Sequence, residues 1–206
     1  MDVTDIELGW NKLCLSGQDR VGLISDAADH ELILRITGGE SELFAELVKR
    51  YQKKVAALIY SLIQHPDEVE DVAQEVFITI YRHLGRFEHR SSFSTWIYRI
   101  TVNKCHDWQR RNYRQKGRFG TVADKDVDLT MVDLNQTEDC LLVRQQVGKL
   151  DEKYRIVIVL YYFHGLKCRE IAGILELPTK SVETRLFRAR KLLALNMGRE
   201  INGGNR

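Results

Sequence analysis

The sequence lacks the marks of a zinc-binding, disulfide-stapled or membrane-spanning protein. Its four cysteines, Cys14, Cys105, Cys140 and Cys168, stand far apart with no C-x-x-C pair, which argues against a structural zinc site and a disulfide framework. No apolar run approaches the roughly 20 residues that a membrane span needs. The first ten residues carry early acids instead of the basic start and apolar core of a signal peptide. We therefore expect a soluble, cytoplasmic protein without membrane insertion.

Motifs that would indicate catalysis are missing as well. The sequence contains no G-x-x-x-x-G-K-S/T phosphate loop and no H-E-x-x-H metal motif. The pair Gly38-Gly39 does not follow a strand pattern, and the six histidines are scattered along the chain. We predict no metal site, no cofactor and no enzymatic activity of the chain's own.

Proline is scarce, and helical periodicity fills the stretches between the two prolines, Pro66 and Pro178. Alternation of the kind typical of strands is nowhere sustained. The β-branched run at 157–160 lies inside a longer helical pattern. The fold class is therefore predicted to be all-α, with two small helical domains joined by a flexible linker.

The helical pattern divides the chain into a front and a back group. Residues 1–30 are weakly patterned, and we interpret residues 115–137, which are acidic and aperiodic, as the linker. A helix is predicted from Glu31, with a pause at Gly38-Gly39. The further predicted helices are 41–63, 67–84, 93–113, 138–148, 151–164, 168–175 and 178–197.

The formal net charge of +2 hides an uneven distribution. Residues 99–118 hold seven Lys or Arg and one Asp, and residues 180–199 hold six basic residues and one Glu. Between them, residues 121–140 hold six acids and one Lys. This layout indicates two polyanion-binding surfaces joined by a linker that repels nucleic acid, although solvated helix faces would look the same.

The strongest local motif is a helix-turn-helix at 168–187, continuing to residue 192. Ala172 supplies the small residue where its two helices meet, and Val182, ten positions later, supplies the apolar plug. Pro178 suits the first turn of the second helix, whereas Glu176 occupies the tight turn, where glycine is common. The second helix would enter a major groove, unless the motif is part of a three-helix bundle that binds no DNA.

The front half resembles region 2 of the extracytoplasmic-function (group IV) sigma factors of RNA polymerase. The resemblance lies in ELFAELVKRYQKKV, DEVEDVAQEVFITIYRHLGRF and SSFSTWIYRITVNKCHDWQRR, and the back half resembles region 4 of the same family. The two regions cover about residues 31–197, and region 3 has no counterpart. The implied domains are an extension (1–30), region 2 (31–114), the acidic linker (115–137), region 4 (138–197) and a tail (198–206).

The resemblance implies roles for the front-half residues. The acidic helix would dock on core RNA polymerase through Glu70, Asp71, Gln74, Glu75, Phe77, Ile78 and Arg82. Phe77 could equally be a core residue. The minus-ten element would be read and melted by Glu88, His89, Arg90, Ser91, Ser92, Asn103, Lys104, Arg110 and Arg111. Trp96 is interpreted as a core residue and His89 as a surface residue.

The same resemblance assigns the minus-thirty-five element to the second helix of the motif. The implied residues are Lys180, Ser181, Glu183, Thr184, Arg185, Phe187, Arg188 and Lys191. Glu183 differs from the basic residue of some relatives, so its contact stays open. The implied partners are promoter DNA, the clamp helices of the polymerase's largest subunit, the flap of its second-largest subunit, and an anti-sigma factor that could hold the chain at the membrane. A stand-alone helix-turn-helix regulator and a protein-interaction module are the alternatives.

Overall fold

All regular secondary structure that the structure describes is helical. The computed structural model describes residues 21–116, 143 and 145–203, and no strand occurs among them. These residues fall into two units: residues 21–116 belong to the first, called the front unit here, and residues 143–203 to the second, called the back unit. The all-α prediction is confirmed. Most of the predicted linker and most of the predicted N-terminal extension lie outside the described residues.

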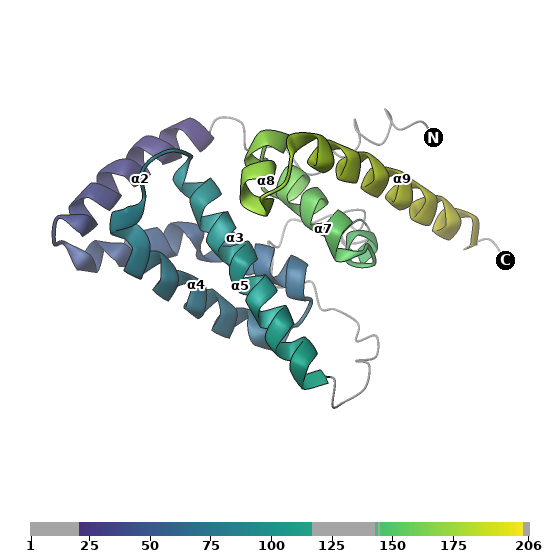
Figure 1. The fold of residues 1–206 in the computed structure, drawn as a ribbon, viewed down its shortest axis with the longest axis horizontal. Helices are drawn as coiled ribbons and strands as arrows, with labels where there is room; N and C mark the ends of the chain where they lie inside the picture. The colour runs from purple at the N-terminus through teal and green to yellow at the C-terminus, as the bar shows by residue number, and fades with distance from the viewer. Residues whose placement is uncertain (1–20, 117–142, 144, 204–206) are drawn as a thin grey trace. The chain divides into compact units, whose positions relative to one another are not determined.

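The front unit is a bundle of helices joined by short 3-10 turns (Figure 1). Helices α3, α4 and α5 pack on one another in all three pairs, and α2 lies against α3 and α5. The helices are α2 (Val21–Thr37), α3 (Phe44–Ile63), α4 (Val69–His83) and α5 (Phe93–Lys116), and the turns are η1 (Ser41–Leu43), η2 (Pro66–Glu68) and η3 (Leu84–Arg86).

Helix α3 occupies the centre of the front core because its apolar residues recur at steps of three and four. Its buried side chains are Leu47, Tyr51, Val55, Leu58, Ile59, Leu62 and Ile63. Each buried aliphatic side chain contributes about 1.5–3 kcal/mol relative to an exposed one. Helix α3 lies within the range 41–63 that the sequence predicted.

The turn between α3 and α4 follows from local backbone chemistry. Gln64 ends α3 in the left-handed conformation (φ 53°), and its N–H donates to the Tyr60 carbonyl at 2.9 Å. His65 is extended (φ −127°), as the residue before a proline tends to be. Pro66 then opens η2, whose two acids, Asp67 and Glu68, suit a helical N-terminus.

Helix α2 begins at Val21, earlier than the predicted start near Glu31, so that prediction was wrong at its N-terminal side. It ends at Thr37, where the predicted pause at Gly38-Gly39 is confirmed. The glycines and acids before residue 31 look like helix breakers in the sequence. One of those acids, Asp29, is fully buried against α3, which no surface pattern reveals.

The back unit contains a helical segment at 145–148, then α7 (Glu152–Ile158), α8 (Cys168–Leu175) and α9 (Thr179–Gly203). Between α7 and α8 the helix widens into a π-helical segment, η5 (Val159–Phe163). The β-branched run at 157–160 is helical, as predicted. The predicted single helix at 151–164 is therefore one α-helix continued by a π turn, a feature that often marks functional sites.

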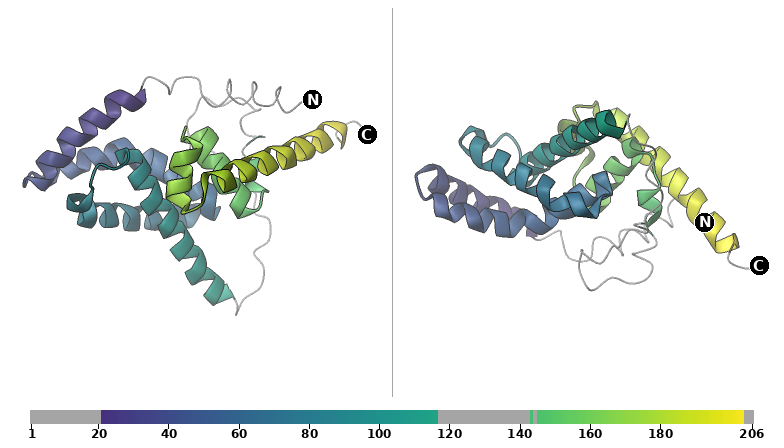
Figure 2. Two further views of the ribbon diagram at one scale, coloured as in Figure 1. Left: turned by 45° about the horizontal axis from the view of Figure 1, so that its top comes forward. Right: turned by 90° about the horizontal axis from the view of Figure 1, so that it is seen from below.

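Helices α8 and α9 form the predicted helix-turn-helix and are joined by a short turn (Figure 2). Ala172 and Val182, the predicted junction and plug, are both buried. Glu176 adopts the left-handed conformation at the end of α8 (φ 54°), and the N–H of Leu177 donates to the Ala172 carbonyl at 3.0 Å. The turn thus closes in the geometry that normally selects glycine, with a glutamate in its place.

Candidate nucleic-acid interface

The outward side of α9 carries the residues predicted to meet the minus-thirty-five element. Ser181 and Arg185 are half-buried and the other six are exposed: Lys180, Glu183, Thr184, Phe187, Arg188 and Lys191. The hydroxyl of Thr184 donates its hydrogen to the Lys180 carbonyl at 2.8 Å. Its oxygen can therefore act toward an outside partner as a hydrogen-bond acceptor. Phe187, at 60% exposure, is a large apolar side chain presented to solvent beside cations.

Arg190 of α9 makes a polar contact with Tyr162 that the sequence did not predict. Arg190 is half-buried, and its Nε donates to the Tyr162 hydroxyl at 2.8 Å. Its guanidinium also lies 5.6 Å from the ring centroids of Tyr161 and Tyr162. Arg190 therefore joins α9 to the π-helical segment η5 and is not one of the outward cations. The paired tyrosines were its only signal in the sequence.

Glu183, whose contact the sequence left open, acts electrostatically on Cys168 of the same unit. Burial raises the pKa of the Cys168 thiol, and the carboxylate of Glu183 raises that pKa further, while Arg190 lowers it. Cys168 is the first residue of α8 and is half-buried. The negative charge of Glu183 thus acts on the start of α8, and its side chain remains exposed for an outside partner as well.

The loop before α5 is exposed and holds the predicted minus-ten pocket residues. Glu88 and Arg90 form an ion pair at 2.6 Å, and His89 adopts a left-handed backbone (φ 54°). The imidazole of His89 lies on Phe87 and makes a 3.2 Å contact with His30 of α2. His89 is a surface residue, as predicted, because it is exposed despite these contacts.

Ser92 has a structural task that its predicted role did not include. Its Oγ accepts the N–H of Thr95 at 3.1 Å, so it caps the N-terminus of α5. The same oxygen lies 2.7 Å from the hydroxyl of Thr95 and 2.9 Å from that of Ser94. The cap fixes where the loop ends and where α5 begins, whereas Ser91 beside it is exposed.

An aromatic cluster supports this loop from below. Phe93 and Trp96 stack with centroids 5.7 Å apart, and Phe87 lies 5.3 Å from Phe93 and 5.4 Å from Trp96. Tyr51 of α3 closes the cluster against Phe93 at 5.6 Å. Trp96 packs inside the unit, as predicted, although it is only half-buried. Aromatic contacts of this kind add about 0.5–1.5 kcal/mol each and give the loop a firm base.

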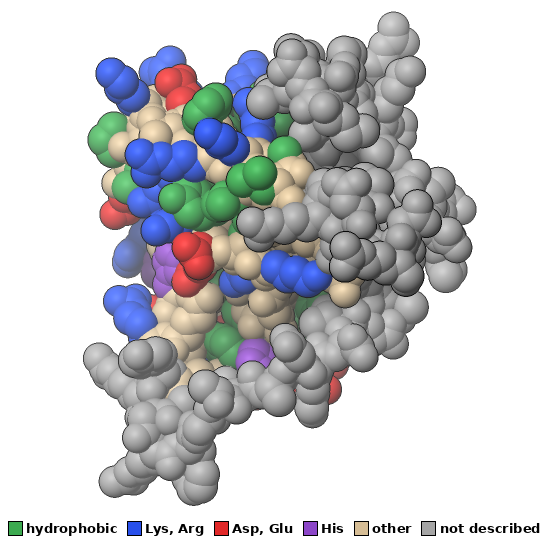
Figure 3. Space-filling view, turned by 90° about the vertical axis from the view of Figure 1, so that its right-hand side faces the viewer, with side chains coloured by type: hydrophobic (Ala, Val, Ile, Leu, Met, Phe, Trp, Pro, Cys, Tyr) green, Lys and Arg blue, Asp and Glu red, His purple; other side chains and the backbone are tan. Residues whose placement is uncertain are grey.

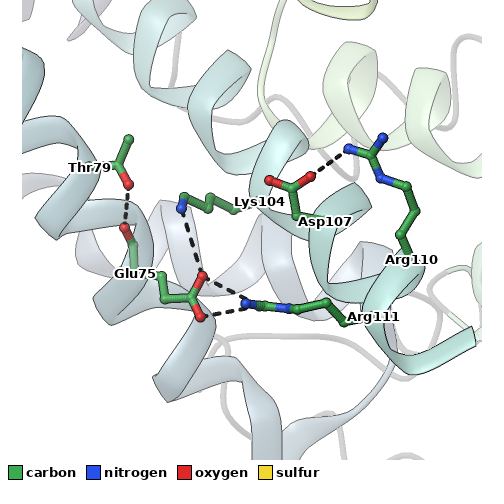
Figure 4. Close-up of polar contacts among 6 residues, drawn as sticks. All are labelled: Glu75, Thr79, Lys104, Asp107, Arg110 and Arg111. Carbon is green, nitrogen blue, oxygen red and sulfur yellow. Dashed lines mark hydrogen bonds and ion pairs between the residues drawn. The ribbon is translucent and has the colours of Figure 1, made fainter. Parts of the chain in front are cut away.

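Helix α5 presents the three cations that were predicted to contact phosphates, Lys104, Arg110 and Arg111, and each of them is already ion-paired. Glu75 of α4 meets Nη2 of Arg111 at 3.1 Å and Nζ of Lys104 at 3.8 Å (Figure 4). Arg110 pairs with Asp107, one turn earlier on its own helix. Asn103, the predicted base contact, is exposed. Glu75 was predicted to face the polymerase, yet the structure brings it to the basic face of α5.

The remaining residues of the predicted docking helix form an outward stripe on α4. Phe77 is half-buried, and the others are exposed: Glu70, Asp71, Gln74, Ile78 and Arg82. The prediction missed Tyr81, which is 48% exposed beside this stripe and packs edge-on against Phe44 at 4.9 Å. An apolar side chain one turn after Ile78 on a polar helix face was the available signal. The stripe is therefore more apolar than the acids suggested.

Positive charge predominates over negative charge among the described residues visible in Figure 3, where hydrophobic side chains lie between the cations. Within the described part of the chain, no group of three or more His, Cys, Asp or Glu side chains could hold a metal ion. None of the helices searched there is long and apolar enough to span a membrane. Surfaces that combine cations with exposed hydrophobic side chains suit contacts with polyanions and with other proteins.

Two family models match the two units. Residues 47–115 match Sigma-70 region 2, and residues 140–193 match Sigma-70, region 4. These matches and the exposed helix-turn-helix define a class, the sigma factors that direct RNA polymerase in transcription initiation.

The similar proteins narrow this class. The RNA polymerase sigma-H factor of Pseudomonas aeruginosa is 32% identical over 83% of this chain and 94% of its own length. The ECF RNA polymerase sigma factor SigW of Bacillus subtilis is 34% identical over 78% and 92%. CnrH, solved in complex with the cytosolic domain of CnrY, superposes with a TM-score of 0.62 at 29% identity over 83% of this chain and 97% of its own. The chain therefore belongs to the extracytoplasmic-function sigma factors.

Proposed function

We propose that the front unit docks on core RNA polymerase through the outward stripe of α4 and melts the minus-ten element with the loop before α5 and with α5 itself. The stripe consists of Glu70, Asp71, Gln74, Phe77, Ile78 and Arg82. A helix with an apolar centre and charged rims suits a helix-against-helix interface with the clamp helices of the largest subunit. Asn103 reads an extruded base, and the cations of α5 hold phosphates.

The back unit reads the minus-thirty-five element with the outward side of α9. The observation that carries this proposal is the helix-turn-helix itself, whose recognition helix exposes Lys180, Thr184, Arg188 and Lys191 while Val182 is buried. Side chains near the start of such a helix reach base edges, and flanking cations hold phosphates. The back unit would also meet the flap of the second-largest subunit. The proposed domain limits are 31–114 and 138–197, with 115–137 as the linker.

A protein partner holds the factor inactive until a signal arrives. The complex of CnrH with the cytosolic domain of CnrY supports such a partner for this chain, and we assign it the role of an anti-sigma factor. The cytosolic domain of a membrane protein would keep the factor at the membrane. The chain itself acts in the cytoplasm, where the promoter DNA lies, and the polymerase performs the chemistry, so the chain has no enzymatic activity.

Run-off transcription with core polymerase from a related bacterium tests this function. The wild-type chain should bind promoter DNA weakly alone and initiate at specific promoters with core polymerase. Arg188→Glu should reduce initiation about tenfold or more, because a lost DNA contact costs about 1–3 kcal/mol. Lys49→Glu makes the same charge change at an exposed site of α3, outside both surfaces, and should initiate normally.

Two results would favour the alternatives. Tight, sequence-specific binding of a duplex by the chain alone, without initiation when polymerase is added, would identify a stand-alone regulator. Unchanged transcription by both Arg188→Glu and Arg185→Glu would identify a protein-interaction module instead of a promoter reader.

A further inference from the structure

One carboxylate of the front unit lies among cations that are predicted to hold DNA. Both oxygens of Glu75 face Nη2 of Arg111, at 3.1 and 3.4 Å, and one of them lies 3.8 Å from Nζ of Lys104. Glu75 belongs to α4, whereas both cations belong to α5, so the contact crosses between the two helices (Figure 4). This is the geometry in which an anion bridges two cations.

Glu75 forms ion pairs with both cations, and all three side chains remain partly exposed to solvent. The side chains of Glu75, Arg111 and Lys104 are 41%, 55% and 27% exposed. Ion pairs that are open to water are weak and are readily exchanged. The contact to Glu75 uses only Nη2 of Arg111, and a guanidinium carries five N–H donors in all, so others can still bind a phosphate oxygen.

The charge of Glu75 nevertheless opposes a phosphate at the same place. A phosphate held by the other donors of Arg111 would lie about 7 Å from the Glu75 carboxylate, where repulsion in water weakens binding about threefold. The sequence-independent part of DNA binding comes from such phosphate contacts. A fixed intramolecular anion therefore weakens binding to any nucleic acid and leaves the contacts to bases untouched.

We propose that Glu75 is a specificity-determining residue of the DNA-facing side: it stands in for a phosphate between Arg111 and Lys104 and suppresses sequence-independent binding. This inference rests on the proposed minus-ten role of α5. It moves Glu75 from the polymerase-docking stripe to the basic face of α5. Asp107 acts in the same sense on Arg110 alone, so its effect is smaller.

The test measures binding of the full-length chain, without polymerase, to a fluorescently labelled oligothymidylate at several salt concentrations. Glu75→Gln keeps the shape of the side chain and removes the charge. It should tighten binding about threefold and steepen the salt dependence by about 0.7 for each additional phosphate neutralised. Asp67→Asn is the matched control, because it removes one charge from an exposed acid in η2, and it should leave binding unchanged.

A second experiment, in a variant that lacks both cations, tests whether Glu75 acts through Lys104 and Arg111. In the double variant Lys104→Gln, Arg111→Gln, the change Glu75→Gln should no longer tighten binding, because the cations that it unmasks are gone. Equal effects of Glu75→Gln and Asp67→Asn would overturn the proposal, since only net charge would matter. Weaker binding by Glu75→Gln would overturn it too, since Glu75 would then help the cations to bind.

The proposed function and this inference are tested by different assays, so the failure of one can be told from the failure of the other. Absence of initiation by the wild-type chain with core polymerase rejects the minus-ten role on which the inference rests. Unchanged oligothymidylate binding by Glu75→Gln rejects the inference even where wild-type transcription is normal.

Discussion

Asp29 joins α2 to α3 through a buried carboxylate. Its side chain is fully buried, one oxygen accepts from Nη1 of Arg50 at 3.0 Å, and the other accepts the hydroxyl of Tyr51. A buried carboxylate is tolerated only when it is paired and hydrogen-bonded in this way. Arg50 also pairs with the exposed Glu46 at 3.3 Å, so one guanidinium serves a buried and an exposed acid.

Asp29→Ala should lower the free energy of unfolding of the front unit by about 3 kcal/mol, because it removes the buried carboxylate that accepts the Tyr51 hydroxyl and pairs with Arg50. Glu46→Gln removes the other partner of Arg50 and should cost less than about 1 kcal/mol, as exposed pairs do. Urea denaturation followed by tryptophan fluorescence measures both. Equal losses for the two variants would contradict the role assigned to Asp29.

Burial and the carboxylate of Glu183 both raise the pKa of the Cys168 thiol. The thiolate is the form that reacts with iodoacetamide, so a raised pKa moves the onset of alkylation to higher pH than in a free peptide. Glu183→Gln removes a charge that disfavours the thiolate and should move the onset back to lower pH. Site-resolved mass spectrometry of alkylation against pH measures this, and an identical profile in both chains would show that Glu183 does not act on Cys168.

Helices were the part of the fold that periodicity could predict. The stripes of α3 and α4 and the junction and plug of the helix-turn-helix are set by side chains within one or two turns, and they lie where the pattern placed them. The start of α2 was missed because Asp29 is satisfied by residues of another helix. Local patterns carry no information on such a partner, and an acid is read as a surface residue by default.

The site was predictable in composition but not in its pairing. The residues expected at the DNA-facing surfaces are mostly exposed, as their polar character implied. Arg190 as a tie to Tyr162 and Glu75 as a partner of α5 depend on geometry between elements, whereas the Ser92 cap is a local contact with Thr95 that the predictions did not include. Residues 36 positions apart, such as Glu75 and Arg111, meet only once the bundle has formed.

At the scale of the whole molecule, the chain carries two cores instead of one. Leu58 and Ile59 are fully buried in the front unit, and Val157 and Ile171 are fully buried in the back unit. Each unit also ends a helix with a residue in the left-handed conformation that is not glycine. These residues are Gln64 after α3 and Glu176 after α8. A side chain with a Cβ pays about 1 kcal/mol for that conformation.

The two left-handed caps allow a test of whether the units unfold separately. Gln64→Gly and Glu176→Gly should each raise the free energy of unfolding of their own unit by about 0.5–1 kcal/mol, because glycine adopts this backbone without strain.

Two spectroscopic signals distinguish the units. Trp96 and Trp108 lie in the front unit, so fluorescence of a chain carrying Trp10→Phe reports that unit, while circular dichroism reports both. Gln64→Gly should raise the urea midpoint seen by fluorescence, and Glu176→Gly should raise only the part of the dichroism transition that fluorescence does not follow. Glu176→Ala keeps a Cβ and should gain nothing. If Glu176→Gly also raised the midpoint seen by fluorescence, the two cores would unfold as one cooperative unit, and the prediction of separate unfolding would be wrong.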